Sequence, residues 1–278
     1  MVVTLPPVPA RALRAGAATV EIPTLGFGTW EVPDDLVGGA LAEAFAAGYR
    51  HVDTARLYRN EEGVGRAVRD SGMPRGDVFV TTKVWQTDFG RVRAAFEGSM
   101  ARLGLDVLDL LLLHWPAPAQ DRYVQAWRDL LALREEGRVR AVGVCNFQIP
   151  HLQRLADETG ELPAINQVEL HPLFQQGALR DFHARHGIVT ESWSPLARGH
   201  LVDDPIVAAV AAKHRVTWAQ VVLRWHLQLG LVVIPRSVTP SRIRENIDLF
   251  GFALDESDMS ALAALDRDLR TGPDPDTF

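Results

Sequence analysis

Residues 48–65, GYRHVDTARLYRNEEGVG, contain the unit from which the rest of the chain is built. A short apolar strand is predicted at 49–52, after a glycine that is typical of a helix end. The strand stops at a carboxylate, Asp53, and Tyr58 lies in the loop that follows. A helix with an acidic start is predicted from Glu61. The pattern indicates a buried strand, a loop with polar side chains and a helix in succession.

The same unit recurs along the whole chain. Buried parallel strands appear in sequence as continuous apolar runs, and such runs alternate here with helix-patterned segments. Strands are predicted at residues 25–30, 49–52, 78–83, 108–116, 139–147, 163–172, 188–195 and 231–237. About eight βα units in a chain of 278 residues are typical of an α/β protein with a (β/α)8 TIM barrel.

Two additions to the barrel are predicted. A β-hairpin (ALRAG, then AATVEIP) precedes the first barrel strand, and an extra helix at 255–268 with a turn-forming tail follows the last. A doubly wound sheet is the alternative, but it normally carries G-x-G-x-x-G after its first strand. The nearest candidate, GFGTWE at 26–31, lacks the third glycine. Since no linker or low-complexity run divides the chain, residues 1–278 are predicted to form a single domain.

Composition narrows the function classes. The net charge of -6 argues against a general nucleic-acid surface, and no apolar run approaches the roughly 20 residues of a membrane span. The first residues lack the basic-then-apolar order of a signal peptide. One cysteine, Cys145, excludes an intramolecular disulfide and fits a reducing compartment. We therefore expect a cytoplasmic protein, a monomer, without membrane or nucleic-acid partners.

Titratable and polar side chains stand at the ends of the predicted strands, where barrel active sites lie. Asp53, Lys83 and His114 end three consecutive strands, and Tyr58 follows the first of them. An ammonium favours the phenolate form of a nearby tyrosine, and a carboxylate holds the ammonium in place. The four residues therefore suggest proton transfer. Taken singly, Asp53 and Lys83 fit a structural ion pair, and His114 fits an ordinary core histidine.

A second group of polar residues surrounds the predicted helix start at Thr239-Pro240. Arg236 and Arg242 flank it, and a helix N-terminus offers free N–H groups that suit an anion such as phosphate. A solvated basic helix start is the alternative. No metal site is predicted, because no acid or cysteine completes a set with His183 and His186.

The motifs GYRHVDTARLYRNEEGVG, VGVCNF and IPRSVTPSRIRENIDLF resemble the three signatures of the aldo-keto reductases, in the right order and spacing. The phrases DLLLLHWP, NQVELHP and GPDPDTF are similar to prokaryotic members, the 2,5-diketo-D-gluconate reductase group. The resemblance implies a barrel that binds NADPH and reduces aldehydes or ketones. It also implies a catalytic tetrad of Asp53, Tyr58, Lys83 and His114, with Tyr58 as proton donor.

The resemblance also implies ligand contacts along the barrel rim. Nicotinamide would lie at Cys145, Asn146, Gln167 and Trp193, above Gly28 and Thr29, and the pyrophosphate along Ser194, Leu196 and Gly199. The 2'-phosphate and adenosine would lie at Arg236, Ser237, Val238, Thr239, Arg242, Glu245 and Asn246. A carbonyl substrate would lie against Trp30, Trp85 and Trp115.

Some features depart from the family pattern or leave alternatives open. Cys145 stands where the family usually has serine, and Arg236 stands where lysine is common. Arg56 and Arg59 flank the tyrosine and would favour anionic substrates, unless they face solvent. An NADPH-binding regulatory subunit with little turnover is the second hypothesis. A lyase that uses Lys83 as a Schiff base is the third, and the neighbouring Asp53 argues against it.

Overall fold

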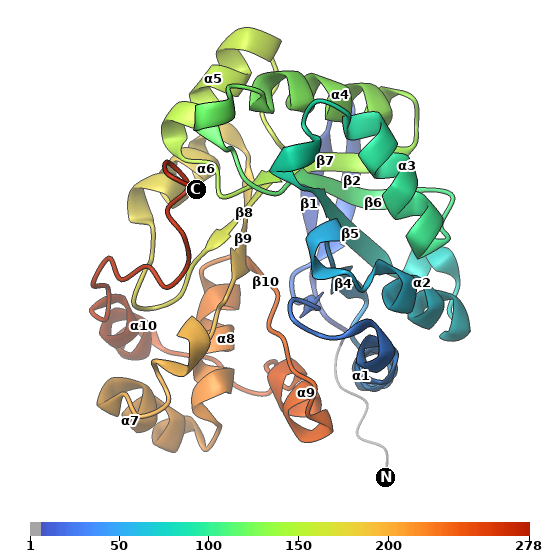
Figure 1. The fold of residues 1–278 in the computed structure, drawn as a ribbon. Coiled ribbons are helices and arrows are strands. Elements are labelled where there is room, and N and C mark those ends of the chain that lie inside the picture. The colour runs from blue at the N-terminus through green and yellow to red at the C-terminus, as the bar shows by residue number, and fades with distance from the viewer. Residues whose placement is uncertain (1–6) are drawn as a thin grey trace.

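The computed structural model describes residues 7–278. Residues 1–6 lie outside the described residues. They belong to the predicted single domain and to the N-terminal segment in which no signal peptide is expected. A parallel sheet, arranged in chain order, forms the centre of the molecule (Figure 1). Its strands are β3 (Phe27–Gly28), β4 (His51–Asp53), β5 (Phe79–Val84), β6 (Leu108–Leu113), β7 (Val139–Cys145), β8 (Ile165–Glu169), β9 (Val189–Trp193) and β10 (Val232–Val233).

Backbone hydrogen bonds close this sheet into a barrel. Leu25, just before β3, forms a parallel bridge with Val233 of β10. The Gly26 amide donates to the Val233 carbonyl at 2.9 Å, and the Val233 amide donates to the Thr24 carbonyl at 2.9 Å. The strands are short and buried, as continuous apolar runs predict. The predicted (β/α)8 barrel is therefore confirmed.

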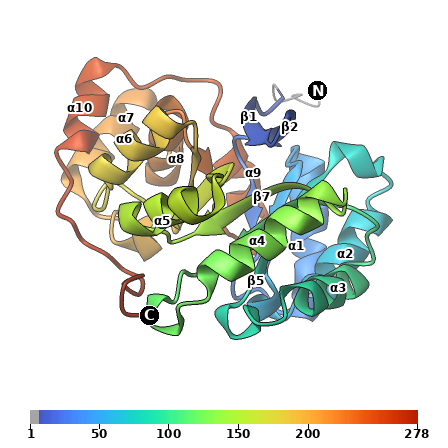
Figure 2. The same cartoon turned by 90° about the horizontal axis from the view of Figure 1, so that it is seen from above.

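Helices surround the barrel, as the view from above shows (Figure 2). They are α1 (Asp34–Ala47), α2 (Glu61–Asp70), α3 (Val92–Leu103), α4 (Tyr123–Glu135), α5 (Ile149–Thr159), α6 (Gly177–His186), α7 (Pro205–His214), α8 (Trp218–Gln228), α9 (Pro240–Ile247) and α10 (Glu256–Ala263). Local sequence explains several of their ends. Asp204 caps α7, Thr217 and Gln220 form a capping box on α8, and Gly48 ends α1 with a left-handed φ of 110°.

The predicted N-terminal hairpin is also present. β1 (Ala10–Ala15) pairs antiparallel with β2 (Ala18–Pro23). Leu13 and Ile22 are fully buried and belong to one apolar cluster with Leu110, Leu112 and Val232 of the barrel strands. The hairpin therefore packs against the barrel interior through its apolar face.

Several elements are shorter than the sequence predicts, among them the strands predicted at 25–30, 108–116, 139–147, 163–172 and 188–195, and the last strand and the last helix show a physical reason. The last strand was expected at 231–237 but spans Val232–Val233, because Pro235 has no N–H to donate to a ladder. The last helix was expected at 255–268 but ends at Ala263. After that helix, the amides of Arg267 and Leu269 donate to the Leu173 carbonyl, so the chain leaves the helix to pair with the loop after β8.

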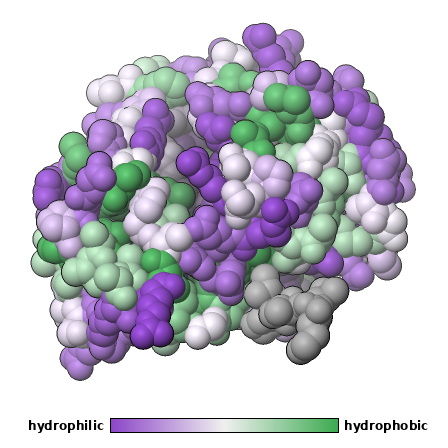
Figure 3. Space-filling view, turned by 90° about the horizontal axis from the view of Figure 1, so that it is seen from below, coloured by the Kyte–Doolittle hydropathy of each residue, from purple (hydrophilic) through white to green (hydrophobic). Residues whose placement is uncertain are grey.

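The surface of the molecule carries both hydrophilic and apolar residues. In the view from below, hydrophilic residues cover much of the face, with apolar residues in small groups among them (Figure 3). Within residues 7–278, no single helix has the length and apolar composition of a membrane span. Helices α7 and α8 meet those criteria only jointly, and they are bent by 88° at their junction.

Candidate active site

The structure brings the four residues of the predicted tetrad together at the carboxyl ends of β4, β5 and β6. Asp53 ends β4, Lys83 lies in β5, His114 follows β6, and Tyr58 ends a single turn, η1 (Arg56–Tyr58). Lys83 Nζ donates to Asp53 Oδ1 at 2.6 Å and to the Tyr58 hydroxyl oxygen at 3.2 Å. It also donates to the Thr54 carbonyl at 2.9 Å. The ammonium thus connects the carboxylate with the phenol.

Burial and charge set the protonation of these groups. Burial raises the pKa of the Tyr58 phenol above its ordinary value, and the Lys83 ammonium opposes that shift. Lys83 therefore acts in the expected direction, while the net shift is upward and keeps Tyr58 protonated. Burial lowers the pKa of Lys83, but Asp53 and Tyr58 outweigh it, so this pKa lies above its usual range. Burial and then Lys83 hold the pKa of His114 well below its ordinary value, so its ring is neutral at neutral pH.

Aromatic side chains surround the Tyr58 and His114 rings. The centroid of Trp30 lies 5.0 Å from that of Tyr58, and Trp85 lies 5.0 Å from His114. The Tyr58 and His114 rings are 5.7 Å apart, edge to face. One ring nitrogen of His114, Nδ1, is buried without a hydrogen-bond partner within residues 7–278. Since orphaned buried polar atoms are rare, this one fits a site that receives a polar ligand.

The third predicted pocket tryptophan, Trp115, contacts a residue that the sequence reasoning missed. The ring of the C-terminal residue, Phe278, lies 4.5 Å from Trp115 and 6.0 Å from Trp85, centroid to centroid. The motif GPDPDTF contains this residue, but the motif does not place its ring in the site, because that position depends on how the whole tail docks. The tail crosses from α10 toward the C-terminus beside α5 (Figures 1 and 2).

The residues expected to hold nicotinamide form a connected set at the ends of β7, β8 and β9. Asn146 Nδ2 donates to the His114 carbonyl at 3.0 Å, and Trp193 Nε1 donates to Asn146 Oδ1 at 2.8 Å. The indole of Trp193 is therefore held in a fixed orientation next to the tetrad. Cys145 is fully buried, and its Sγ lies 3.8 Å from Gln167 Oε1.

Gln167 has more partners than the sequence indicates. Its Nε2 donates to Asp53 Oδ2 at 2.8 Å and to Glu191 Oε2 at 2.8 Å. Glu191 lies in β9 and was not identified from the sequence, although a charged residue inside the apolar run IVTESWSP is a signal that could have found it. Gln167 thus contacts the tetrad through its hydrogen bond to Asp53, and its amide oxygen faces Cys145.

Backbone geometry near the rim fits a bound cofactor. Thr29 is buried, and its Oγ1 donates to the Asp53 carbonyl at 2.9 Å. A β-carbon at Gly28 would lie 3.0 Å from the Ile234 carbonyl oxygen, so a larger residue would crowd the backbone that follows β10. Asn146 and Ser194 have left-handed φ values of 64° and 49°, a region that non-glycine residues adopt rarely and that recurs at active sites and ligand clamps.

The predicted anion site surrounds the start of α9. Within the described part of the chain, the N-cap residue Thr239 makes no side-chain hydrogen bond to this helix, so its first N–H groups remain available to a ligand. Arg236, Val238, Thr239 and Arg242 are exposed around it, and Arg236 Nη2 donates to Glu31 Oε2 at 3.2 Å. Ser237 and Asn246 are buried, and Glu245 is half-buried. On the loop after β9, Leu196 is half-buried and Gly199 is exposed.

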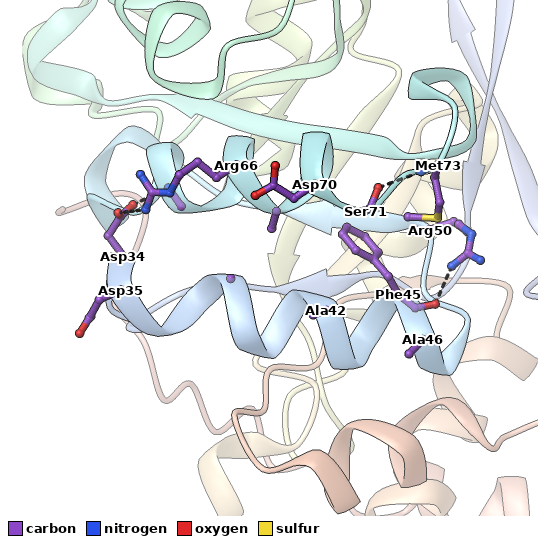
Figure 4. Close-up of a pocket in the computed structure, with 13 residues that line it drawn as sticks. Asp34, Asp35, Ala42, Phe45, Ala46, Arg50, Arg66, Asp70, Ser71 and Met73 are labelled. Carbon is purple, nitrogen blue, oxygen red and sulfur yellow. Dashed lines mark hydrogen bonds and ion pairs between the residues drawn. The ribbon is translucent and has the colours of Figure 1, made fainter.

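A separate hollow of about 610 Å³ lies on the outside of the barrel, between α1 and α2 (Figure 4). Its polar groups bond to one another: Arg66 Nη2 donates to Asp34 Oδ2 at 2.7 Å, and Arg50 Nη1 donates to the Phe45 carbonyl at 3.0 Å. All the site residues expected from the sequence lie within 7–278, and none of them lines this hollow. The tetrad, and not this hollow, therefore holds the candidate chemistry.

Comparison with known proteins agrees with this geometry. Residues 24–267 match the model of the aldo/keto reductase family. Methylglyoxal reductase DkgA of Escherichia coli K12 is 51% identical over 259 residues, 92% of this chain and 94% of that protein. An aldo-keto reductase of Mycolicibacterium smegmatis is 50% identical over 93% of this chain and 94% of that protein.

Solved structures match closely as well. A mutant of Gox0644 in complex with NADPH is 48% identical, with a TM-score of 0.91, over 96% of this chain and 98% of that one. An aldo/keto reductase of Brucella melitensis is 48% identical, with a TM-score of 0.89, over 93% of this chain and 100% of that one. The chain belongs to the aldo/keto reductase family.

Proposed function

We propose that this chain is an NADPH-dependent reductase of aldehydes and ketones in which Tyr58 protonates the carbonyl oxygen. The hydrogen-bonded series Asp53–Lys83–Tyr58 is the observation that carries the proposal. Burial keeps Tyr58 protonated, as a proton donor must be, and Lys83 stabilises the phenolate that remains after transfer. The neutral His114 ring donates a hydrogen bond that orients the carbonyl oxygen.

The donor set at the rim fits NADPH. Asn146, Gln167 and the oriented indole of Trp193 suit the nicotinamide end, and the uncapped start of α9 with Arg236 and Arg242 suits a phosphate. When bound, NADPH supplies the hydride that goes to the carbonyl carbon. The chain's own residues bind and orient the reactants, exclude water with tryptophans, and deliver the proton from Tyr58.

For substrate, we infer small carbonyl compounds such as methylglyoxal or 2,5-diketo-D-gluconate. Relatives at about half identity are named methylglyoxal reductase, and Trp30, Trp85 and Trp115 provide aromatic walls near the tetrad. Arg56 is paired with the buried Asp88, and Asp88 also pairs with Arg91 at 2.9 Å. Because one carboxylate serves two arginines, this cluster keeps a positive charge, and Arg59 on the other side of the tyrosine adds to the charge that would attract anionic keto acids. A monomeric, cytoplasmic enzyme is part of the same proposal, and size-exclusion chromatography tests the monomer.

The Tyr58→Phe variant tests the proton donor. It keeps the aromatic ring but removes the hydroxyl, so turnover is expected to fall by roughly 10²–10⁴-fold, the usual contribution of a general acid. Loss of NADPH absorbance with methylglyoxal, an aromatic aldehyde, a keto ester and 2,5-diketo-D-gluconate measures turnover, with NADH run in parallel. Quenching of tryptophan fluorescence measures NADPH binding, which should be unchanged.

Undiminished turnover in Tyr58→Phe would show that another group donates the proton. A wild-type protein that binds NADPH saturably yet reduces none of these compounds would favour the regulatory-subunit hypothesis instead. A strong preference for NADPH over NADH would support the assignment of Arg236 and Arg242 to the 2'-phosphate.

A further inference from the structure

A second buried carboxyl group lies directly beneath the tetrad. Glu191 is fully buried in β9, with its side chain inside the barrel near the β4 and β5 side chains. Its Oε2 accepts from Gln167 Nε2 at 2.8 Å. Its Oε1 has no hydrogen-bond partner within residues 7–278, and His51 Nε2 lies 3.7 Å away. The proton-transfer mechanism proposed above makes no use of this group.

The charges around Glu191 do not balance if it is ionised. The groups that face it are His51 and Asp53 of β4, Lys83 of β5, Cys145 of β7 and the amide of Gln167 of β8. Lys83 already pairs with Asp53. Burial lowers the pKa of His51 to about 3, so that ring is neutral. Among the groups that face Glu191 within residues 7–278, one ammonium therefore serves two carboxyl groups, and Glu191 is the one without a cation.

Gln167 connects the two carboxyl groups. Its single amide nitrogen has two hydrogens, and it lies 2.8 Å from both Asp53 Oδ2 and Glu191 Oε2. An amide held at both hydrogens cannot rotate without losing a buried hydrogen bond. Asp53 in turn is held on one side by Gln167 and on the other by Lys83. The position of Lys83 relative to Tyr58 thus depends on a series that begins at Glu191.

We propose that Glu191 is a positioning residue of the reductase: its carboxyl group holds the Gln167 amide against Asp53 and thereby fixes Lys83 toward Tyr58. The inference rests on the proposed function, since it concerns the same proton transfer. Ionisation of Glu191 adds a second negative charge near Lys83 and Tyr58. That charge makes the phenol hold its proton more strongly, so reduction slows as Glu191 loses its proton.

Two substitutions separate the hydrogen bond from the charge. Glu191→Gln keeps an oxygen that accepts from Gln167 but cannot ionise. Glu191→Leu removes both properties. Asp109→Asn is the matched control, because Asp109 is also a buried carboxylate on a barrel strand, but it pairs with Arg75 and Arg140 away from the tetrad. Each variant is assayed for kcat/KM of carbonyl reduction between about pH 6 and pH 9.5, together with NADPH affinity at each pH.

Burial and the neighbouring Asp53 raise the pKa of Glu191 to about 8, so the wild-type profile should fall on the basic side near that pH. Glu191→Gln should keep near-normal turnover at pH 6 and lose this fall. Glu191→Leu should lose at least about tenfold in kcat with NADPH affinity retained, because misplacement by an ångström costs about 10²-fold. Asp109→Asn should keep the wild-type profile.

If the wild type is active and Glu191→Gln has the same pH profile as the wild type, this inference is overturned and the proposed function stays intact. A wild type without carbonyl reductase activity would overturn both. If Glu191→Leu does not fold, the profile of Glu191→Gln alone decides.

Discussion

At the scale of single residues, Glu191 should lower the stability of the folded protein near neutral pH. An unfolded glutamate titrates near 4.5, whereas burial raises the pKa of Glu191 to about 8. The folded state therefore binds this proton more tightly. The stability that this group contributes is complete below pH 4.5 and is lost as the pH rises toward 8. Near pH 7 the loss is roughly 3 kcal/mol.

Glutamine at position 191 ionises in neither state, so Glu191→Gln should raise the free energy of unfolding near pH 7. An expected gain of about 1–3 kcal/mol allows for a less favourable hydrogen bond. Urea unfolding of both proteins at about pH 7.5 and pH 5 measures it, and the gain should shrink at the lower pH. Equal destabilisation of the variant at both pH values would mean that Glu191 is charged in the folded protein.

The sequence predicted that the tetrad residues lie close together, but it did not predict the residues that hold them in place. Asp53, Lys83 and His114 end adjacent parallel strands, and such ends meet at one rim of a barrel, so their proximity followed from the strand assignment. The supporting contacts did not follow. Whether Glu191 faces the barrel interior depends on strand register, and the net rise in the Tyr58 pKa depends on burial, which a strand-end pattern does not contain.

At the scale of elements, the packing of α2 against α3 depends on Gly65. A β-carbon at this position would collide with the backbone carbonyl group of Leu103, which cannot move aside as a side chain would. Gly65→Ala should therefore destabilise the protein by roughly 1–3 kcal/mol through overpacking. Gly38→Ala is the control, since Gly38 lies within α1 with nothing within 4 Å of its β-carbon position.

Because alanine favours helix over glycine, Gly38→Ala should stabilise by about 0.5–1 kcal/mol. Thermal unfolding of the two variants beside the wild type measures both effects. If both substitutions shift the melting temperature upward, α2 and α3 do not approach each other as closely as the structure shows.

Element ends were predictable where a local signal sets them. Gly48, Asp204 and Thr217 act through contacts within one helix turn, so the end of α1 and the starts of α7 and α8 follow from local sequence. The end of α10 was not predictable, because Arg267 and Leu269 leave the helix to bond the distant Leu173 carbonyl. An apolar pattern shows that a segment is buried, but not which neighbour takes its backbone hydrogen bonds.

At the scale of the whole molecule, one buried carboxylate fixes the tail across the barrel rim. Glu169 of β8 accepts through Oε1 from the Thr271 amide and hydroxyl, each at 2.6 Å, and through Oε2 from the Gly272 amide at 2.9 Å. Burial would raise its pKa, but hydrogen bonds from His171, Thr271 and Gly272 outweigh burial and lower it. From this anchor the tail continues to Phe278 beside Trp85 and Trp115.

Glu169→Gln should release the tail. Glutamine offers one acceptor oxygen, so its amide group would face an N–H donor, and an unpaired buried donor costs about 1–3 kcal/mol. Because Phe278 then leaves Trp85 and Trp115, KM for the carbonyl substrate should rise several-fold, whereas kcat at saturating NADPH should change little. Carboxypeptidase should also remove C-terminal residues faster.

Phe278→Ala is the control: it should raise KM without faster digestion, because it removes the aromatic contact and keeps the hydrogen bonds of Glu169 to the tail. Digestion of Glu169→Gln at the wild-type rate would mean that contacts beyond Glu169 are sufficient to hold the tail.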